Sequence, residues 1–239
     1  MTLWKHWLHW AAPLRPACAR NRTFLWMCVI LMGFCVREDL LGVTSFVRAL
    51  GLDAMFYDRL LDFFHSGALD VGRLSALWAA LVTRAHPGVL RCRGRLVLVG
   101  DGLKVPKSGR KMPAVKKLHQ PSDSNTKPPY IMGHSCQAVG VLVQAGASVA
   151  ALPLAARIHE GVVFSNRDQR TLLDKMIALL DSLALFVPFY FVADAYYASR
   201  KLARPLLARG SHLLTRVRNN AVAYHPAPPP EQNKRGRPR

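Results

Sequence analysis

Two short apolar runs, each followed at once by an aspartate, constrain the fold of this chain more than any other feature. The runs are residues 96–100 (LVLVG), before Asp101, and residues 189–193 (FYFVA), before Asp194. Runs of this length and composition are typical of buried strands, so each aspartate is expected at the C-terminal end of a strand. If the two strands are parallel neighbours, the carboxylates lie side by side and repel each other unless a proton or a cation lies between them. The pattern predicts a metal or phosphate site.

The charge of the chain indicates a polyanionic partner. Its 239 residues carry a formal net charge of +19, and 51% of them are apolar, which is enough for a sizeable core and excludes wholesale disorder. Residues 91–120 hold nine basic residues and one acid, and residues 200–239 hold ten basic residues and one acid. Because these segments flank both aspartates, the metal site is expected to act on nucleic-acid phosphates. The alternative is a basic protein whose charge only keeps it in solution.

The cysteines argue against a disulfide framework and against a zinc site. There are five of them, an odd number, without a C-x-x-C pair, and no histidine pair stands near a cysteine at metal-ligand spacing. We expect small buried side chains in the reducing environment of the cytoplasm. The five are Cys18, Cys28, Cys35, Cys92 and Cys136.

One apolar segment raises the question of a membrane. Residues 24–36 (FLWMCVILMGFCV) carry no charge, but a membrane-spanning helix needs about 20 apolar residues. A signal peptide would be followed by small residues at a cleavage site, whereas Arg37, Glu38 and Asp39 follow here. The segment therefore predicts a buried helix, and a membrane anchor is the competing hypothesis.

The N-terminal third is predicted to be helical. Residues 1–22 are basic and rich in tryptophan and are expected to form a loosely attached arm, and residues 23–88 a helical region that could bind DNA ends. Asp53 is expected to cap a helix over 54–64, and a third helix starts near Asp70 and stops at 86–88. Helix, glycine turn and helix also fit a helix-turn-helix. A plain bundle is favoured because acids on the second helix would repel phosphates.

From residue 90 to 220 the pattern changes to strands with a crossover helix. Ser165 or Asn166 is expected to cap that helix, and Pro153 places its strand at a sheet edge or at a bulge. Residues 221–239 are proline-rich and then basic, and are not expected to fold alone. The expected order is strand 95–101, a long polar loop, strand 131–143, a turn at 144–147, strand 148–158, helix 167–183, strand 188–194, helix 199–209 and strand 211–217.

The segments around the two aspartates resemble a known family. The first runs from Asp101 (DGLKVPKSGRKMP) through 116–119 (KKLH) to 128–134 (PPYIMGH), and the second is 191–197 (FVADAYY). These segments, and the 93 residues that separate the two aspartates, resemble the catalytic core of DDE-type insertion-sequence transposases over about residues 90–239. The resemblance implies an α/β fold: an RNase H-like mixed sheet with flanking helices, preceded by an all-helical N-terminal region.

The resemblance also implies an activity and its residues. Asp101 and Asp194 would be the first two of three catalytic acids that hold two Mg²⁺ (or Mn²⁺) ions for DNA strand cleavage and strand transfer in cut-and-paste transposition. Partners would be double-stranded DNA, as transposon ends and target, and a second copy in a homodimer, without a membrane, at the bacterial nucleoid. Contacts to the DNA backbone should weaken steeply with salt. The DNA-binding residues would be Lys104, Lys107, Arg110, Lys111, Lys116, Lys117, Arg216, Arg218, Arg235 and Arg237.

One departure from the family pattern concerns the third acid. The family carries a glutamate on a helix beyond the last strand, whereas Glu231, the only acid after Asp194, stands in the proline-rich tail, and Glu160 precedes the crossover helix. The sequence therefore predicts a transposase truncated before its third acid and inactive as this polypeptide, and the alternative is a DNA-binding protein without catalysis. The stretch 235–238 (RGRP) resembles an AT-hook, although a basic surface loop is favoured.

Overall fold

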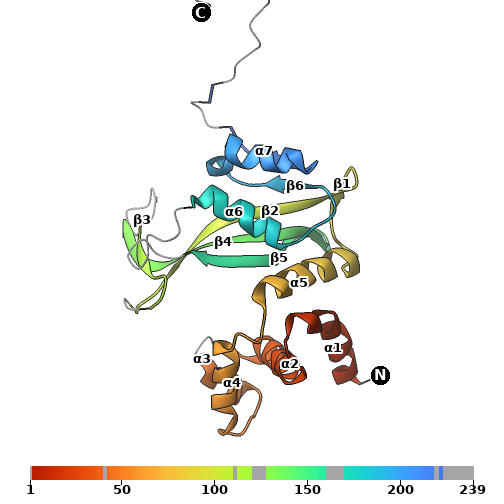
Figure 1. Cartoon of the computed structure of the whole chain (residues 1–239), viewed down its shortest axis with the longest axis vertical. Coiled ribbons are helices and arrows are strands. Elements are labelled where there is room, and N and C mark those ends of the chain that lie inside the picture. Colours follow the sequence, from red (N-terminus) through yellow and green to blue (C-terminus); the bar gives the residue numbers. More distant parts are fainter. Residues whose placement is uncertain are drawn as a thin grey trace, which may run out of the picture.

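The computed structural model describes residues 2–39, 42–109, 112–119, 128–159, 170–217 and 221–222. A helical N-terminal region is followed by a seven-stranded mixed sheet with helices packed on it (Figure 1). The expected α/β class, with its helical N-terminal region, is confirmed.

The N-terminal region is an assembly of short helices with two small apolar cores of its own. One core is built around Leu14, Cys18 and Met27, and the other around Ile30, Phe46 and Leu60. The elements are α1 (Leu3–Ala11), the 3₁₀ helix η1 (Ala12–Ala17), α2 (Asn21–Val36), α3 (Gly42–Ala49), α4 (Phe56–His65) and α5 (Val71–Ala85).

The first residues differ from the loosely attached arm that the sequence predicted. Residues 3–17 are helical, and Leu14 and Ala17 are buried. The indole nitrogen of Trp7 donates a hydrogen bond to the carbonyl of Cys28, 3.3 Å away. The apolar side chains of this segment thus find their partners on α2 and α5, which no local pattern indicates.

Helix α2 contains the apolar segment for which a membrane anchor was considered. It has 16 residues, and Met27, Cys28, Ile30 and Gly33 are buried against its neighbours. Across the described ranges, no helix combines the length and the apolar character needed to cross a bilayer.

The sheet has the strand order β3-β4-β2-β6-β7, with β5 beside β4 and the short β1 beside β2. Strands β2, β6 and β7 are parallel to one another, and β4 is antiparallel to β2 and to β5. This is the RNase H-like arrangement that the resemblance implied. The strands are β1 (Arg91–Cys92), β2 (Arg95–Pro106), β3 (Lys116–His119), β4 (Tyr130–Ala145), β5 (Ser148–His159), β6 (Phe189–Val192) and β7 (His212–Leu214).

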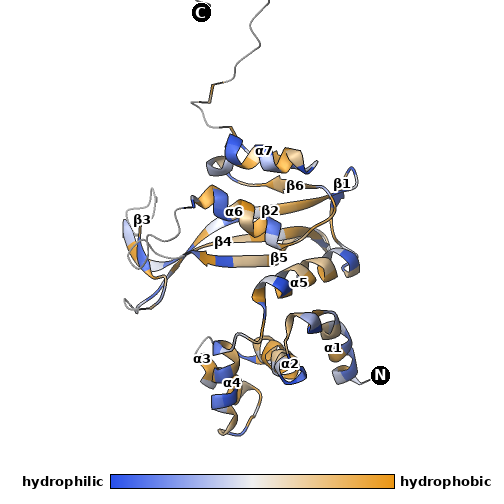
Figure 2. Cartoon of the chain, viewed as in Figure 1, coloured by the Kyte–Doolittle hydropathy of each residue, from blue (hydrophilic) through white to orange (hydrophobic). Residues whose placement is uncertain are grey.

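Three helices cover one face of this sheet. These are α5, α6 (Leu172–Ser182) and α7 (Arg200–Ala208), and Figure 1 shows α6 lying across β2 and β4. Apolar side chains alternate along the strands, so Leu96 and Leu98 of β2 are fully buried under the helices while Val97 and Val99 are half-buried. Figure 2 shows the hydrophobic residues concentrated along the strands beneath the helices.

The opposite face is more open near Asp101. Val99, Asp101, Ala138, Gly140 and Pro153 contribute to the lining of a shallow hollow of about 230 Å³ there. The small side chains on this face do not cover the neighbouring backbone, so Asp101 remains accessible to solvent.

Two local expectations are confirmed and one differs. Pro153 lies on an edge strand, and the β4–β5 register shifts by one residue between Val139 and Gly140, which is the predicted bulge. Asp70 caps α5. The crossover helix begins at Leu172 with Thr171 as its cap, whereas Ser165 and Asn166 lie outside the described residues.

Candidate functional site

The register of β2 and β6 brings the two aspartates to the same level of the sheet. The two strands are parallel neighbours, and their last paired residues are Val99 and Val192. Asp101 follows two residues later within β2, and Asp194 follows two residues after the end of β6. Both residues are exposed. The sequence predicted a shared site only if the two strands are adjacent and parallel. The structure shows that they are.

Each aspartate is held by its own local backbone. Asp101 Oδ1 accepts a hydrogen bond of 2.7 Å from the amide of Gly102. Asp194 Oδ1 accepts one of 3.1 Å from the amide of Tyr196, at the start of the 3₁₀ turn η2 (Ala195–Tyr197). The hydroxyl of Thr215 donates to the Asp194 carbonyl at 2.7 Å, which ties the turn to the end of β7. These bonds leave the second oxygen of each carboxylate available.

A close contact inside the sheet sets the spacing of β2 and β6 beside the aspartates. The ring of Phe191 is fully buried and lies over Gly100, where a Cβ atom would come within 2.5 Å of its Cζ. Gly100, the residue before Asp101, therefore leaves room for the ring of Phe191, which lies three residues before Asp194 in the chain.

A buried pair of polar side chains lies next to both aspartates. The Tyr197 ring is buried, and Gln137 of β4 donates a 2.9 Å hydrogen bond to its hydroxyl. Burial raises the pKa of Tyr197 to about 12; the Gln137 hydrogen bond opposes this rise, and the charges of Asp101 and Asp194 add to it. The phenol is thus neutral at physiological pH.

The donor set suits a hard divalent cation. The two carboxylates offer anionic oxygen atoms, which are the ligands that Mg²⁺ prefers. In the part of the chain that the structure describes, neither carboxylate forms an ion pair with a lysine or arginine. Among those same residues no cluster of three potential metal ligands occurs. Glu160 and Glu231 lie outside the described ranges.

Three basic residues that follow Asp101, Lys104, Lys116 and Lys117, lie on strands rather than on the predicted long loop. β2 continues to Pro106 because residues 98–106 pair with β4, and β3 adds a short strand on the other side of β4. Lys104, Lys107 and Lys117 are exposed. The Lys104 ammonium donates to the His119 carbonyl at 2.6 Å, and that of Lys117 lies 4.4 Å from the centre of the Tyr130 ring.

The remaining predicted DNA-binding residues are partly placed. Lys116 is half-buried, and burial together with the charge of Lys175 lowers its pKa. Arg216 is exposed just beyond β7. The others lie outside the described residues: Arg110, Lys111, Arg218, Arg235 and Arg237.

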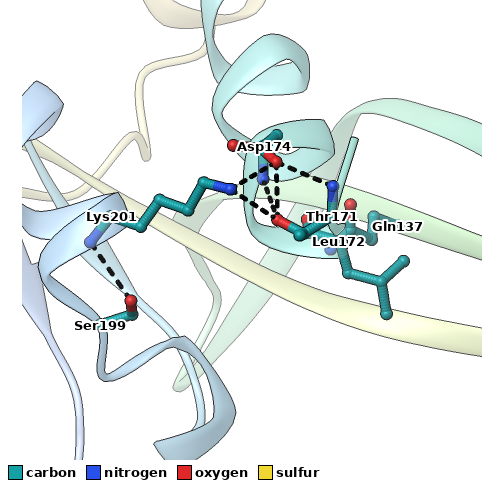
Figure 3. Close-up of polar contacts among 6 residues, drawn as sticks. All are labelled: Gln137, Thr171, Leu172, Asp174, Ser199 and Lys201. Atoms are coloured by element: carbon teal, nitrogen blue, oxygen red, sulfur yellow. Dashed lines mark hydrogen bonds and ion pairs between the residues drawn. The ribbon is translucent and has the colours of Figure 1, made fainter. Parts of the chain in front are cut away.

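The structure adds polar contacts that the sequence argument missed, at the N-terminus of α6 (Figure 3). Thr171 and Asp174 form a reciprocal capping box, and the Lys201 ammonium from α7 reaches Asp174 at 2.7 Å and Thr171 at 3.2 Å. The hydrogen bond from Lys201 is the main reason that the Asp174 pKa falls to about 2. The T-x-x-D spacing is a recognisable capping signal, whereas the partner on α7 is visible only in three dimensions.

Comparisons with known proteins place this arrangement in a family. No curated protein matches the sequence. A cryo-EM structure of the piggyBac transposase synaptic complex with hairpin DNA is similar, with 16% identity and a TM-score of 0.39. The similarity covers 92% of this chain and 46% of that chain, so this chain spans less than half of its length. The family described as DDE superfamily endonuclease matches residues 13–239. The chain therefore belongs to the DDE superfamily endonucleases.

Proposed function

We propose that Asp101 and Asp194 jointly bind Mg²⁺ or Mn²⁺ and that this site cleaves and joins DNA strands, as in the transposition of an insertion sequence. The observation that carries the proposal is the β2–β6 register, in which both aspartates stand two residues beyond the last parallel pair. Family membership supports a DNA-cleaving chemistry in the same sheet.

The chemistry assigned to the site follows from its charges. A divalent cation, when bound, would activate a water or a DNA 3′-hydroxyl and stabilise the leaving oxygen of the phosphodiester. Asp101 and Asp194, which are both exposed, would hold that cation through their carboxylate oxygens. The rigid backbone around Gly102 and Tyr196 keeps the carboxylates oriented, as a preorganised site requires.

DNA would be positioned by the basic strands beside the site. Lys104 lies on β2 beyond Asp101, Lys107 follows directly after the end of β2, and Lys117 lies on β3. Contacts of lysine with phosphate position a duplex without reading its sequence. Arg216, exposed after β7, would extend this surface on the other side of Asp194.

We further propose that residues 1–239 by themselves bind the cation weakly. The family resemblance implies three acids, and only Glu231 follows Asp194 in the sequence, within a proline-rich segment. Two carboxylates supply fewer ligands than three, so cation affinity should be weak and Mn²⁺ should support activity at lower concentrations than Mg²⁺.

A strand-cleavage assay tests the proposal. Supercoiled plasmid incubated with the protein and Mn²⁺ should be nicked, and Asp101→Ala or Asp194→Ala should reduce the rate by on the order of 10²-fold, the scale of losing one group that stabilises transition-state charge. Asp181→Ala is the matched control, because Asp181 is an exposed acid that pairs with Arg209 on the helices.

The outcomes separate two functions. Nicking that requires Mn²⁺ and both aspartates supports the endonuclease. Binding of plasmid without metal-dependent nicking, at Mn²⁺ concentrations well above those that saturate the site, would favour the alternative of a DNA-binding protein without catalysis.

A further inference from the structure

Gln137 is a buried polar side chain at a position where an apolar residue would suit the core better. It lies on β4 among Val139, Val141 and Val143 on the face that the helices cover, and its side chain is 1% exposed. Within the described residues its Oε1 atom has no hydrogen-bond partner. A buried amide with an unpaired oxygen destabilises a fold, so the presence of glutamine here calls for an explanation beyond stability.

The contacts of Gln137 fix the orientation of its amide group. Its Nε2 atom lies 3.0 Å from the carbonyl oxygen of Leu172 and 2.9 Å from the hydroxyl of Tyr197. A carbonyl oxygen can only accept, so the atom facing Leu172 must be the NH₂ group. The same nitrogen therefore donates its second hydrogen to the Tyr197 oxygen. Figure 3 shows Gln137 beside Leu172 at the start of α6.

This geometry determines where the Tyr197 hydroxyl lies. With its oxygen accepting from Gln137, the hydroxyl is held in place on the helix-covered face of the sheet. The oxygen lies beside Gly102, where a Cβ atom would be 3.7 Å away, so it is next to the residue that follows Asp101. The Tyr197 amide also donates to the Asp194 carbonyl at 3.1 Å, which places the same residue on the turn that carries Asp194.

We propose that Gln137 and Tyr197 are a pair of positioning residues for the acidic site: Gln137 holds the phenol against Gly102 and against the turn that carries Asp194, and this contact fixes the backbone from which both carboxylates project toward a cation. This inference rests on the proposed function, since it assumes that the two aspartates bind the metal. Neither Gln137 nor Tyr197 is a ligand in this scheme, and Gln137 acts only through Tyr197. Polar groups that orient ligands in this way typically contribute 10–100-fold to metal affinity.

Free Mn²⁺ measured by electron paramagnetic resonance during titration of the full chain tests the pair without an activity assay. Gln137→Met and Tyr197→Phe should each raise the Mn²⁺ dissociation constant about 10-fold. The double variant should be no weaker than Tyr197→Phe alone, because Gln137 has nothing to position once the hydroxyl is gone. Tyr197→Phe keeps the ring that packs against Phe191, so it provides a folded variant even if Gln137→Met unfolds.

Matched controls come from the same elements. Tyr196→Phe removes the hydroxyl of the exposed neighbouring tyrosine, and Gln144→Met replaces a glutamine of the same strand whose side chain donates to Gly146 in the adjoining turn. Both should leave the dissociation constant within about twofold of wild type, the scale expected for substitutions outside the network.

Each result supports or overturns the inference. An unchanged constant in Tyr197→Phe, or independent effects that multiply to about 100-fold in the double variant, would show that Gln137 does not act through Tyr197. If the wild-type protein does not bind Mn²⁺, or if Asp194→Asn leaves its binding intact, the proposed function fails, and the inference that rests on it fails too. If Asp194→Asn abolishes Mn²⁺ binding but the substitutions at Gln137 and Tyr197 leave the dissociation constant unchanged, only the inference is overturned.

Discussion

At the scale of single residues, the spacing of the site depends on a glycine. Gly100 lies under the Phe191 ring, and no larger residue fits without moving that fully buried side chain. Phe191 is held by the core on its other sides, including an edge-to-face contact with Tyr197. A displacement of Phe191 would therefore be transmitted to the turn that carries Asp194.

We predict that Gly100→Ala destabilises the protein by about 1–3 kcal/mol, the usual cost of forcing an extra methyl group into a packed core. Gly102→Ala is the control, because its Cβ would meet only the Tyr197 hydroxyl at an ordinary 3.7 Å. Urea unfolding of the two variants measures the difference. Equal stabilities for the two would show that the ring is not confined as described.

The residues of the site differ in how far the sequence could predict them. Asp101 and Asp194 were identified because each ends an apolar run, and that pattern is local. Gln137 carries no local signal, since a glutamine in an apolar strand can face either side of a sheet. Its burial depends on Leu172 and Tyr197, which are 35 and 60 residues away in the chain.

At the scale of elements, the start of α6 joins three parts of the chain. The capping box of Thr171 and Asp174 orders the first turn, Lys201 ties it to α7, and Gln137 ties it to β4 (Figure 3). Because α7 follows the turn that carries Asp194, this junction holds one side of the acidic site in place.

The ion pair at this junction predicts a pH dependence. The hydrogen bond from Lys201, with smaller contributions from Thr171, lowers the Asp174 pKa from 3.8 to about 2, so the carboxylate stabilises the fold while it is charged. That stabilisation is complete above about pH 4 and is lost as the pH falls toward 2. The stability difference between wild type and Asp174→Asn should therefore shrink over this range in urea unfolding. Lys201→Met should remove the same pH-dependent part, and a difference that stays constant down to pH 2 would contradict the assignment.

The strands show where sequence patterns stop being informative. Strand β2 was expected to end at Asp101, but it continues to Pro106 with every residue from Asp101 onward exposed. Alternation between buried and exposed positions is the main signal for a strand, and it is lost when both faces meet water. This extension of β2 forms because it pairs with β4, whose residues lie about 30 positions further along the chain. Neither segment has a sequence pattern that predicts this pairing.

At the scale of the whole molecule, the chain combines a helical region with a sheet covered by helices on one face (Figure 1). The parallel placement of β2 and β6, which are separated in the chain by β3, β4, β5 and α6, was implied by the family resemblance, not by composition or periodicity. The apolar runs alone predicted two buried strands that each end near an aspartate, but not that these strands are parallel neighbours. The basic strands and the acidic strand ends then meet at one end of the sheet, as a nuclease acting on phosphates requires.

The central claim is that Asp101 and Asp194 share one cation, and paramagnetic broadening of NMR signals by substoichiometric Mn²⁺ tests it most directly. Backbone amides next to Asp101 and next to Asp194 should broaden together, before those of any other segment, and a single Asp101→Asn or Asp194→Asn substitution should abolish both effects. Broadening confined to one of the two strand ends, or spread over the exposed acids of the helices, would contradict the account.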